Sequence, residues 1–220
     1  MTYPISASCQ IKRLNDIYGQ YFHGKTDGVF VEVGGHDGYS WSNTWGLAEV
    51  GWRGLYYEPI PDLAERCKVT HANNNVKVLN VCVGDQFDEA NGKVKLWIGS
   101  NPTIDEETMK LSPWDGDKYD PNKFIMSPCV TLNTSLVDED IPHEFDLLSI
   151  DVEGAELHVL NGLDLHRWHP KMIIIETHNK HSIVTKSYNA HKIIEHVLLW
   201  PYEIIYDDTL NTIFYLNESI

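Results

Sequence analysis

The sequence lacks the features that mark membrane proteins, secreted proteins and cysteine-rich metal sites. Its longest apolar runs, such as Met172–Ile175, fall far short of the roughly 20 residues that span a bilayer. Residues Met1–Ser8 show no basic start followed by an apolar stretch, so we expect no secretory signal. The four cysteines form no CxxC pair and show no metal-site spacing. These absences predict a cytoplasmic protein with reduced thiols and no membrane partner.

Positive charge is also scarce. The 220 residues include 17 Lys and Arg against 32 Asp and Glu, which gives a net charge of −15 with neutral histidines. A field of that sign repels phosphate backbones, so we expect no nucleic-acid partner. Apolar residues make up 42% of the chain, enough for one domain with a sizeable buried core.

Strand and helix patterns alternate along most of the chain. Apolar residues at helical spacing between 9 and 23 predict a leading helix, and we expect residues 1–27 to form an N-terminal helical extension. Residues 28–220 are expected to form a single Rossmann-like α/β domain, with a mostly parallel seven-stranded sheet, helices on both faces and an antiparallel C-terminal strand. The expected strands are 29–33, 55–58, 76–83, 145–150, 171–176, 202–206 and 212–216, with an additional edge strand at 94–98. The expected helices are 42–49, 61–67, 155–163 and 187–199.

Residues from about 100 to 128 break this rhythm. The segment is rich in Pro, Asp and Lys, and a long irregular stretch inside a compact domain is commonly a lid or a binding loop. We therefore expect an inserted loop that binds the substrate through Trp114 and Tyr119. Trp114 could equally anchor the loop to the core, as buried aromatic side chains often do. Three other tryptophans are expected to be packing residues: Trp41, Trp45 and Trp52.

A glycine-rich turn follows the first buried strand. The string Glu32-Val33-Gly34-Gly35-His36-Asp37-Gly38 places an acid just ahead of the glycines, at the carboxyl end of a strand where open α/β sheets bind ligands. Glycine lets the backbone turn sharply and lets a ligand approach closely. The dinucleotide pattern Gly-x-Gly-x-x-Gly is absent, because His36 and Tyr39 occupy two of its glycine positions. A plain strand-turn-helix junction is the alternative explanation of this string.

A second acid ends the second expected strand. Glu58, followed by Pro59, lies about 20 residues beyond the glycines, where such folds place the acid that binds both ribose hydroxyls. A helix-capping or surface acid would also fit this position. The spacing of the glycine turn and of Glu58 agrees with one nucleoside-binding crevice.

Polar residues also end two later strands. Asp151 follows the strand at 145–150, and Glu176 and His178 lie at the end of the strand at 171–176. These two strands should be neighbours, so Asp151, Glu176 and His178 are expected to converge on one crevice as catalytic groups. The further acids Glu153 and Glu156 are expected to favour the N-terminus of the following helix electrostatically.

With these segments, the sequence resembles the FkbM family of class I S-adenosylmethionine-dependent methyltransferases over about residues 28–180. The most specific marker is the string Ile150–Glu156 followed by Val159–Gly162. In this family the acid at Glu32 is often Asp, and the position of His36 is often Asn. The resemblance implies S-adenosyl-L-methionine as the cofactor and a hydroxyl of a sugar, glycan or secondary metabolite as the methyl acceptor.

The resemblance also implies where the cofactor would bind. The methionine portion would contact Glu32, Gly34, Gly35, His36 and Gly38. The ribose would contact Glu58 and Pro59, and the adenine would be flanked by Cys82 and Val83, with Asp85 as a further neighbour.

Two ways of deprotonating the acceptor hydroxyl stay open. Asp151 or His178 accepts the proton directly, or Asp151, Glu176 and His178 hold Mg²⁺ or another divalent cation that lowers the pKa of the hydroxyl. Two other functions also stay open: an NAD-dependent oxidoreductase, which the glycine spacing disfavours, and a non-catalytic protein that binds S-adenosylmethionine or a nucleotide. The sequence predicts no oligomeric state.

Overall fold

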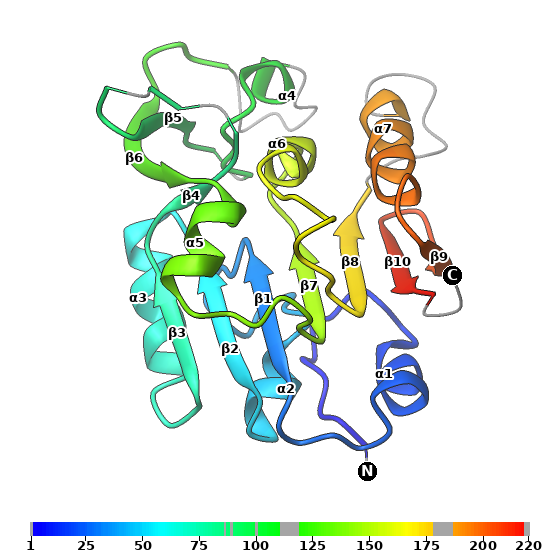
Figure 1. Ribbon diagram of the computed structural model, residues 1–220. Coiled ribbons are helices and arrows are strands. Elements are labelled where there is room, and N and C mark those ends of the chain that lie inside the picture. The colour runs from blue at the N-terminus through cyan, green and yellow to red at the C-terminus, as the bar shows by residue number, and fades with distance from the viewer. Residues whose placement is uncertain are drawn as a thin grey trace.

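The computed structural model describes residues 2–85, 87–88, 90–99, 101–110, 119–177 and 187–217. Figure 1 shows its helices and strands. The helices are α1 (Leu14–Phe22), α2 (Trp45–Glu49), α3 (Pro61–Thr70), α4 (Glu106–Lys110), α5 (Leu132–Asp138), α6 (Glu156–Asn161) and α7 (Ser187–Leu198). The strands are β1 (Val29–Val33), β2 (Arg53–Tyr57), β3 (Val76–Leu79), β4 (Cys82–Val83), β5 (Lys93–Trp97), β6 (Phe124–Val130), β7 (Leu147–Ile150), β8 (Met172–Glu176), β9 (Tyr202–Asp207) and β10 (Asn211–Leu216).

Seven strands form the main sheet, in the order β3-β2-β1-β7-β8-β10-β9. Neighbours from β3 to β8 are parallel, and β10 runs antiparallel to both β8 and β9. This arrangement confirms the predicted Rossmann-like sheet with an antiparallel C-terminal strand. Strand order reverses between β1 and β7, and at such a point the loops beyond the carboxyl ends of the strands separate and leave a crevice.

The two faces of the sheet carry separate layers of helices. Successive strand side chains point to opposite faces. On β1, Val31 and Val33 pack with buried side chains of α5, α6 and α7. Phe30 packs with buried side chains of α1, α2 and α3 on the opposite face. The predicted leading helix therefore belongs to the core, because Leu14 and Tyr18 of α1 are buried in this second layer.

The expected strand at 76–83 is two strands in different sheets. β3 ends at Leu79, and β4 pairs with Cys129 and Val130 of β6 in a small sheet of order β4-β6-β5. The side chain of Asn80 donates to the carbonyl oxygen of Glu58 at 2.8 Å. This side-chain bond lies at the point where the chain leaves the main sheet. Cys82 and Val83 consequently belong to the small sheet that stands above the strand tips in Figure 1.

The segment from about 100 to 128 was expected to be irregular throughout, and this expectation is wrong for two stretches. It contains α4 and most of β6, which pairs antiparallel with β5. Pro128 argues against a strand because it cannot donate to a ladder, and the exposed Ile125 and Met126 obscure the alternation of β6. The expected edge strand at 94–98 is confirmed as β5. Trp114 lies outside the described residues.

The described helices are all too short, or too polar, to cross a lipid bilayer.

Gly34 lies where the ends of three strands approach one another closely. Its φ is +91°, and its N–H donates to the carbonyl oxygen of Tyr57 at 3.0 Å. A Cβ atom at this position would lie 1.7 Å from the carbonyl oxygen of Asp151. The tips of β1, β2 and β7 can therefore approach this closely only around a glycine.

Gly34→Ala is expected to lower the free energy of unfolding by more than about 3 kcal/mol, because it adds a backbone clash to an unfavourable φ. Urea denaturation measures the change. Gly19→Ala is the matched control: Gly19 is exposed on α1 with no atom within 4 Å of a new Cβ, and alanine there should stabilise the helix by about 0.5–1 kcal/mol. Equal stabilities of the two variants would contradict the proposed contact.

Candidate functional site

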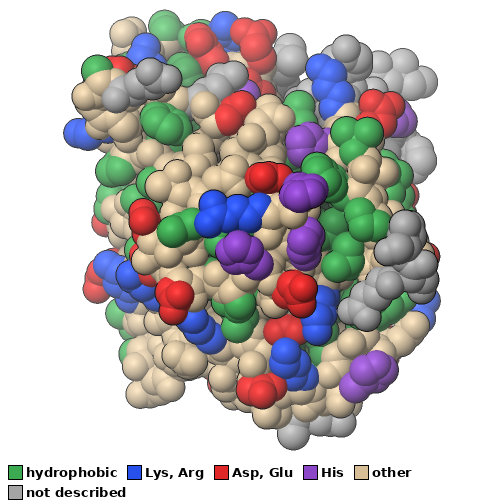
Figure 2. All heavy atoms as spheres, in the orientation of Figure 1, with side chains coloured by type: hydrophobic (Ala, Val, Ile, Leu, Met, Phe, Trp, Pro, Cys, Tyr) green, Lys and Arg blue, Asp and Glu red, His purple; other side chains and the backbone are tan. Residues whose placement is uncertain are grey.

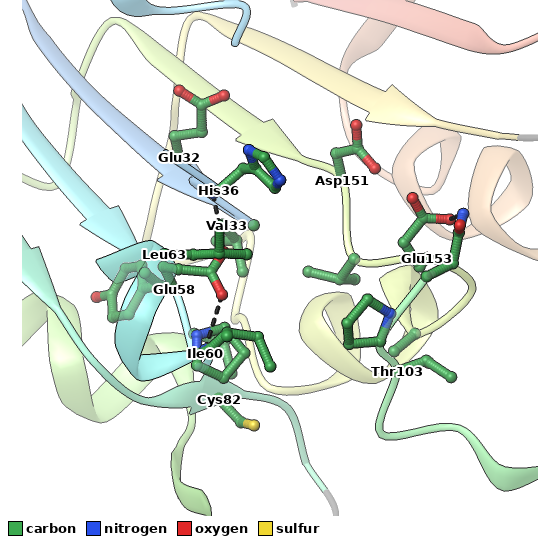
Figure 3. A pocket seen from close by; sticks show the side chains of 18 of the residues that line it. Glu32, Val33, His36, Glu58, Ile60, Leu63, Cys82, Thr103, Asp151 and Glu153 are labelled. Carbon is green, nitrogen blue, oxygen red and sulfur yellow. Dashed lines mark hydrogen bonds between the residues drawn. The ribbon is translucent and has the colours of Figure 1, made fainter. Parts of the chain in front are cut away.

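A cavity of about 410 Å³ opens beyond the carboxyl ends of β1, β2, β7 and β8. Its volume lies within the range of roughly 300–1,000 Å³ that is usual for small-molecule sites. Figure 3 shows a close view of this pocket, with ten of its residues labelled. The cavity lies at the reversal of strand order, where sequence reasoning placed the ligand.

One end of the cavity is apolar. Ile60 and Leu63 line it from the segment after β2 and from α3, and Cys82, Val83 and Leu96 line it from the small sheet. Burial raises the pKa of the Cys82 thiol to about 11, so the thiol stays neutral. This end offers an apolar slot suited to a flat, uncharged ring.

Glu58 stands beside the apolar end. One carboxylate oxygen accepts the backbone N–H of His36 and the other accepts that of Ile60, both at 2.8 Å (Figure 3). The side chain is 5% exposed, and burial raises the pKa of its carboxyl to about 7. Each oxygen has a further lone pair. The two backbone donors therefore fix a carboxylate that can accept hydrogen bonds from a diol in the cavity.

Glu32 lines the cavity from β1 and points away from Glu58 in Figure 3. Its oxygens accept hydrogen bonds from the hydroxyls of Ser42 and Thr44 and from the N–H of Asn43. Burial raises the pKa of Glu32 to about 7 despite these donors. The loop before α2 thus fixes this carboxyl group at the cavity wall.

The glycine turn divides into residues that line the cavity and residues that shape the turn. Gly34 and His36 line it, as does Pro59 after β2. Gly35 and Gly38 are not lining residues. A Cβ on Gly35 would lie 2.8 Å from the Tyr56 ring, and one on Gly38 would meet the ring of His71 at the same distance.

Two further predicted site residues lie elsewhere. An oxygen of Asp85 lies 2.8 Å from Nδ1 of His158, at hydrogen-bonding distance. Asp85 does not line the cavity. Tyr119 lies against α4, where its hydroxyl donates to Glu106 and Lys110 stands over its ring. Neither position supports contact with a ligand in this cavity.

Asp151 and Glu176 meet at the other end of the cavity. β7 and β8 are neighbours, and they bring the carboxyl groups of Asp151 and Glu176 together, with one oxygen of each within 4.8 Å of the other. Burial and the charge of Glu153 raise the pKa of Asp151 to about 7. Burial and the charge of Asp151 raise the pKa of Glu176 well above its usual range. His178, the third predicted member of this group, lies outside the described residues.

Glu153 lies beside this pair, and the sequence analysis did not predict that it would belong to the site. One carboxylate oxygen of each of Asp151, Glu153 and Glu176 lies within 4.8 Å of the others. Glu153 was expected at the start of a helix, but α6 begins three residues later, and Glu153 has a left-handed φ of 56° in the preceding turn. The side chain of Asn101 donates to it across the cavity wall. The Glu153-Gly154 pair was the available signal, because glycine often accompanies such turns.

The position of Trp41 differs from the one predicted from the sequence. It was predicted to be a packing residue, but its side chain is 51% exposed and lines the cavity. The predicted helix at 42–49 begins only at Trp45, so Trp41 stands in the loop before it. Trp52 is fully buried, as expected.

The buried carboxyl groups give the protein a predicted dependence of stability on pH. Burial raises the pKa of Glu32, Glu58 and Glu156 from 4.5 to about 7. Between these values the folded protein binds protons that the unfolded chain has released, so stability is highest below the unfolded value and is lost as the pH rises to 7. The free energy of unfolding in urea should fall by at least about 2 kcal/mol between pH 5 and pH 8.

Glu156→Gln provides the control for this prediction. Only Oε1 of Glu156 accepts the N–H groups of Val152 and Gly154, and glutamine keeps that acceptor. The variant should therefore lose the part of the pH dependence that comes from Glu156 and keep the part that comes from the other buried carboxyl groups. An unfolding free energy that is constant or rises over this range would contradict the buried state of these groups.

The fold is similar to that of solved methyltransferases. A putative O-methyltransferase from Klebsiella pneumoniae superposes with a TM-score of 0.52 at 14% identity, over 98% of this chain and 84% of that chain. An O-methyltransferase from Bacillus cereus, solved in complex with SAH, gives 0.50 at 14% identity over 98% and 83%. A ribosomal protein L11 methylase from Lactobacillus delbrueckii subsp. bulgaricus gives 0.50 at 10% identity over 94% and 80%. The architecture is therefore that of the class I methyltransferases.

The family is shown by the sequence itself. The family model described as the methyltransferase FkbM domain matches residues 32–200. The chain belongs to this family, which confirms the resemblance stated above. The comparison with curated proteins finds no match.

Proposed function

We propose that the protein transfers the methyl group of S-adenosyl-L-methionine to a hydroxyl of a small-molecule or glycan acceptor. The observation that carries the proposal is the position of Glu58, whose carboxylate is held by two backbone donors at the tip of β2. In Figure 3 it lies near Ile60 and across the cavity from Asp151 and Glu153. Membership of the FkbM family and the methyltransferase fold support the same function.

The donor set fits the cofactor. Glu58 would accept hydrogen bonds from the ribose hydroxyls, and the apolar end would enclose the adenine between Ile60 and Leu63 on one side and the small sheet on the other. Glu32 and the turn at Gly34 would hold the methionine portion. Carboxyl groups around this end favour a sulfonium cation electrostatically.

The cofactor supplies an already activated methyl group, so this chain mainly has to orient the acceptor and remove its proton. The raised pKa of both Asp151 and Glu176 favours a pair that holds one proton and one negative charge, and this charge can accept a further proton. The pKa of Asp151, raised to about 7, suits a general base at neutral pH. In this version the Asp151–Glu176 pair would take the proton of the acceptor hydroxyl, whose oxygen would gain the methyl group as the S–CH3 bond breaks and S-adenosylhomocysteine leaves.

A divalent cation is the second version of this step. The spacing of the carboxylate oxygens of Asp151, Glu153 and Glu176, within 4.8 Å of one another, is compatible with shared ligation of Mg²⁺. Such an ion would lower the pKa of a bound hydroxyl. Exhaustive chelation separates the versions: undiminished turnover supports the direct base, and a loss that Mg²⁺ restores supports the cation.

The proposed function is tested in two steps. Calorimetry with S-adenosylhomocysteine, S-adenosylmethionine and NAD should show binding of the first two and none of NAD. Transfer of a labelled methyl group is then measured over a panel of hydroxyl acceptors. Binding of NAD alone would support the oxidoreductase instead, and tight cofactor binding without transfer to any acceptor would support a non-catalytic binding protein.

A further inference from the structure

Resting on the proposed function, we propose that Trp41 is the stacking platform of an acceptor subsite that takes an uncharged ring compound. The ligand chemistry is a ring with one apolar face and a free hydroxyl, as in a neutral pyranoside or a simple phenol. Two independent features of the cavity support this assignment: the placement of Trp41 and the charge of the residues around it.

Trp41 lines the cavity and lies outside the buried core. The side chain is 51% exposed, and its ring meets the edge of His36 with centroids 5.2 Å apart. Its backbone N–H donates to the hydroxyl of Ser8 at 2.9 Å, and Gln10 of the same N-terminal segment also lines the cavity. The ring thus contacts His36, the backbone of Trp41 is bonded to the N-terminal segment, and about half of the residue stays exposed. Indole faces of this kind bind apolar ring faces.

The backbone at Trp41 is unusual for a bulky residue. Its φ is 59°, in the left-handed region that non-glycine residues seldom adopt. Five non-glycine residues of the described chain have positive φ, and three of them line the cavity: His36, Trp41 and Glu153. Residues in such conformations are strained, and they persist only where the surrounding structure compensates for the strain. They are commonly found at functional sites. The conformation that places the indole at the cavity is therefore maintained by the fold.

The charge around the cavity selects against anions. Five acids line it, namely Glu32, Glu58, Asp151, Glu153 and Glu176, and its described lining contains no Lys or Arg. The outer face in Figure 2 differs, because Lys and Arg side chains are interspersed there with acids. An acceptor that carries a phosphate or a carboxylate would meet like charge at these five acids, and the described lining residues include no Lys or Arg to pair with it. The acceptor is therefore an uncharged ring rather than a sugar phosphate or a uronic acid.

Ligand-observed saturation-transfer NMR tests this subsite without relying on turnover. The full-length protein is first incubated with enough S-adenosylhomocysteine to fill the cofactor site. Methyl pyranosides, phenols, a hexose phosphate and a uronic acid are then added to separate samples. A neutral ring should show transfer to the protons of one face, and the two anions should show none. Trp41→Ala should reduce the signal by at least about fivefold, and Trp41→Phe should keep it within about twofold. The pyranoside and phenol arms show which kind of ring binds.

Tyr39→Ala is the matched control, because Tyr39 is an exposed aromatic residue two positions away that does not line the cavity. It should leave the signal unchanged. All variants should bind S-adenosylhomocysteine as the wild type does, which also shows that they are folded. A signal insensitive to Trp41→Ala, equal binding of the anions, or no binding of any neutral ring overturns the subsite. Absence of S-adenosylhomocysteine binding in the wild type, with ring binding that still depends on Trp41, would refute only the methyltransferase function.

Discussion

Glu58→Gln is expected to weaken the binding of S-adenosylhomocysteine by about 100-fold, measured by calorimetry. Both carboxylate oxygens of Glu58 accept backbone N–H groups, from His36 and Ile60. A glutamine side chain has only one oxygen, so its amide group would face one of these donors and turn away from it. The variant thus loses the charge that strengthens the ribose hydrogen bonds and also the rigid placement of the remaining acceptor.

Glu65→Gln is the control for this variant. Glu65 lies on α3, seven positions further along, and its exposed carboxylate is paired with Lys68 at 3.3 Å. The same chemical change there should leave the dissociation constant unchanged. If Glu58→Gln binds as tightly as the wild type while remaining folded, the ribose does not contact Glu58.

Asp151→Asn is expected to lower kcat by about 100- to 10,000-fold, the usual contribution of a general base. The amide cannot accept the proton of the acceptor hydroxyl, and it breaks the carboxyl pair that Asp151 forms with Glu176. Binding of S-adenosylhomocysteine should change by no more than about twofold, because the loss concerns the acceptor proton. In the wild type, kcat should rise with pH through about 7, as the pair loses its extra proton.

Asp27→Asn is the matched control, since Asp27 is exposed just before β1, at the opposite end of that strand from the cavity. It should leave both kcat and its pH profile unchanged. Undiminished turnover of Asp151→Asn would remove Asp151 from both versions of the deprotonation step, the direct base and the cation ligand.

The main sheet could be predicted from the sequence because its strands are short, apolar and separated by turn residues. β7 and β8 are buried along their whole length, so their apolar runs are unambiguous. β6 escaped prediction because its exposed residues and Pro128 hide the strand period. At the break between β3 and β4, the side chain of Asn80 bonds to the end of the neighbouring strand β2. Contacts of that kind become visible only once the chain is folded.

The site could be predicted in part for a similar reason. Acids that directly follow buried strands, such as Asp151 and Glu58, must emerge at the same edge of a parallel sheet. Glu153 and Trp41 reach the cavity through left-handed backbone conformations that their residue types do not favour. The sequence therefore indicated a crevice with acids at the strand tips, but it did not indicate the third acid or the aromatic wall.

The central claim is that the cavity at the tips of β1, β2, β7 and β8 binds the adenosyl cofactor. A crystal structure with S-adenosylhomocysteine tests it most directly. The account predicts both ribose hydroxyls on the Glu58 carboxylate, the adenine beside Ile60 and Cys82, and the sulfur facing Asp151. A ligand bound elsewhere, or a ribose turned away from Glu58, would contradict it.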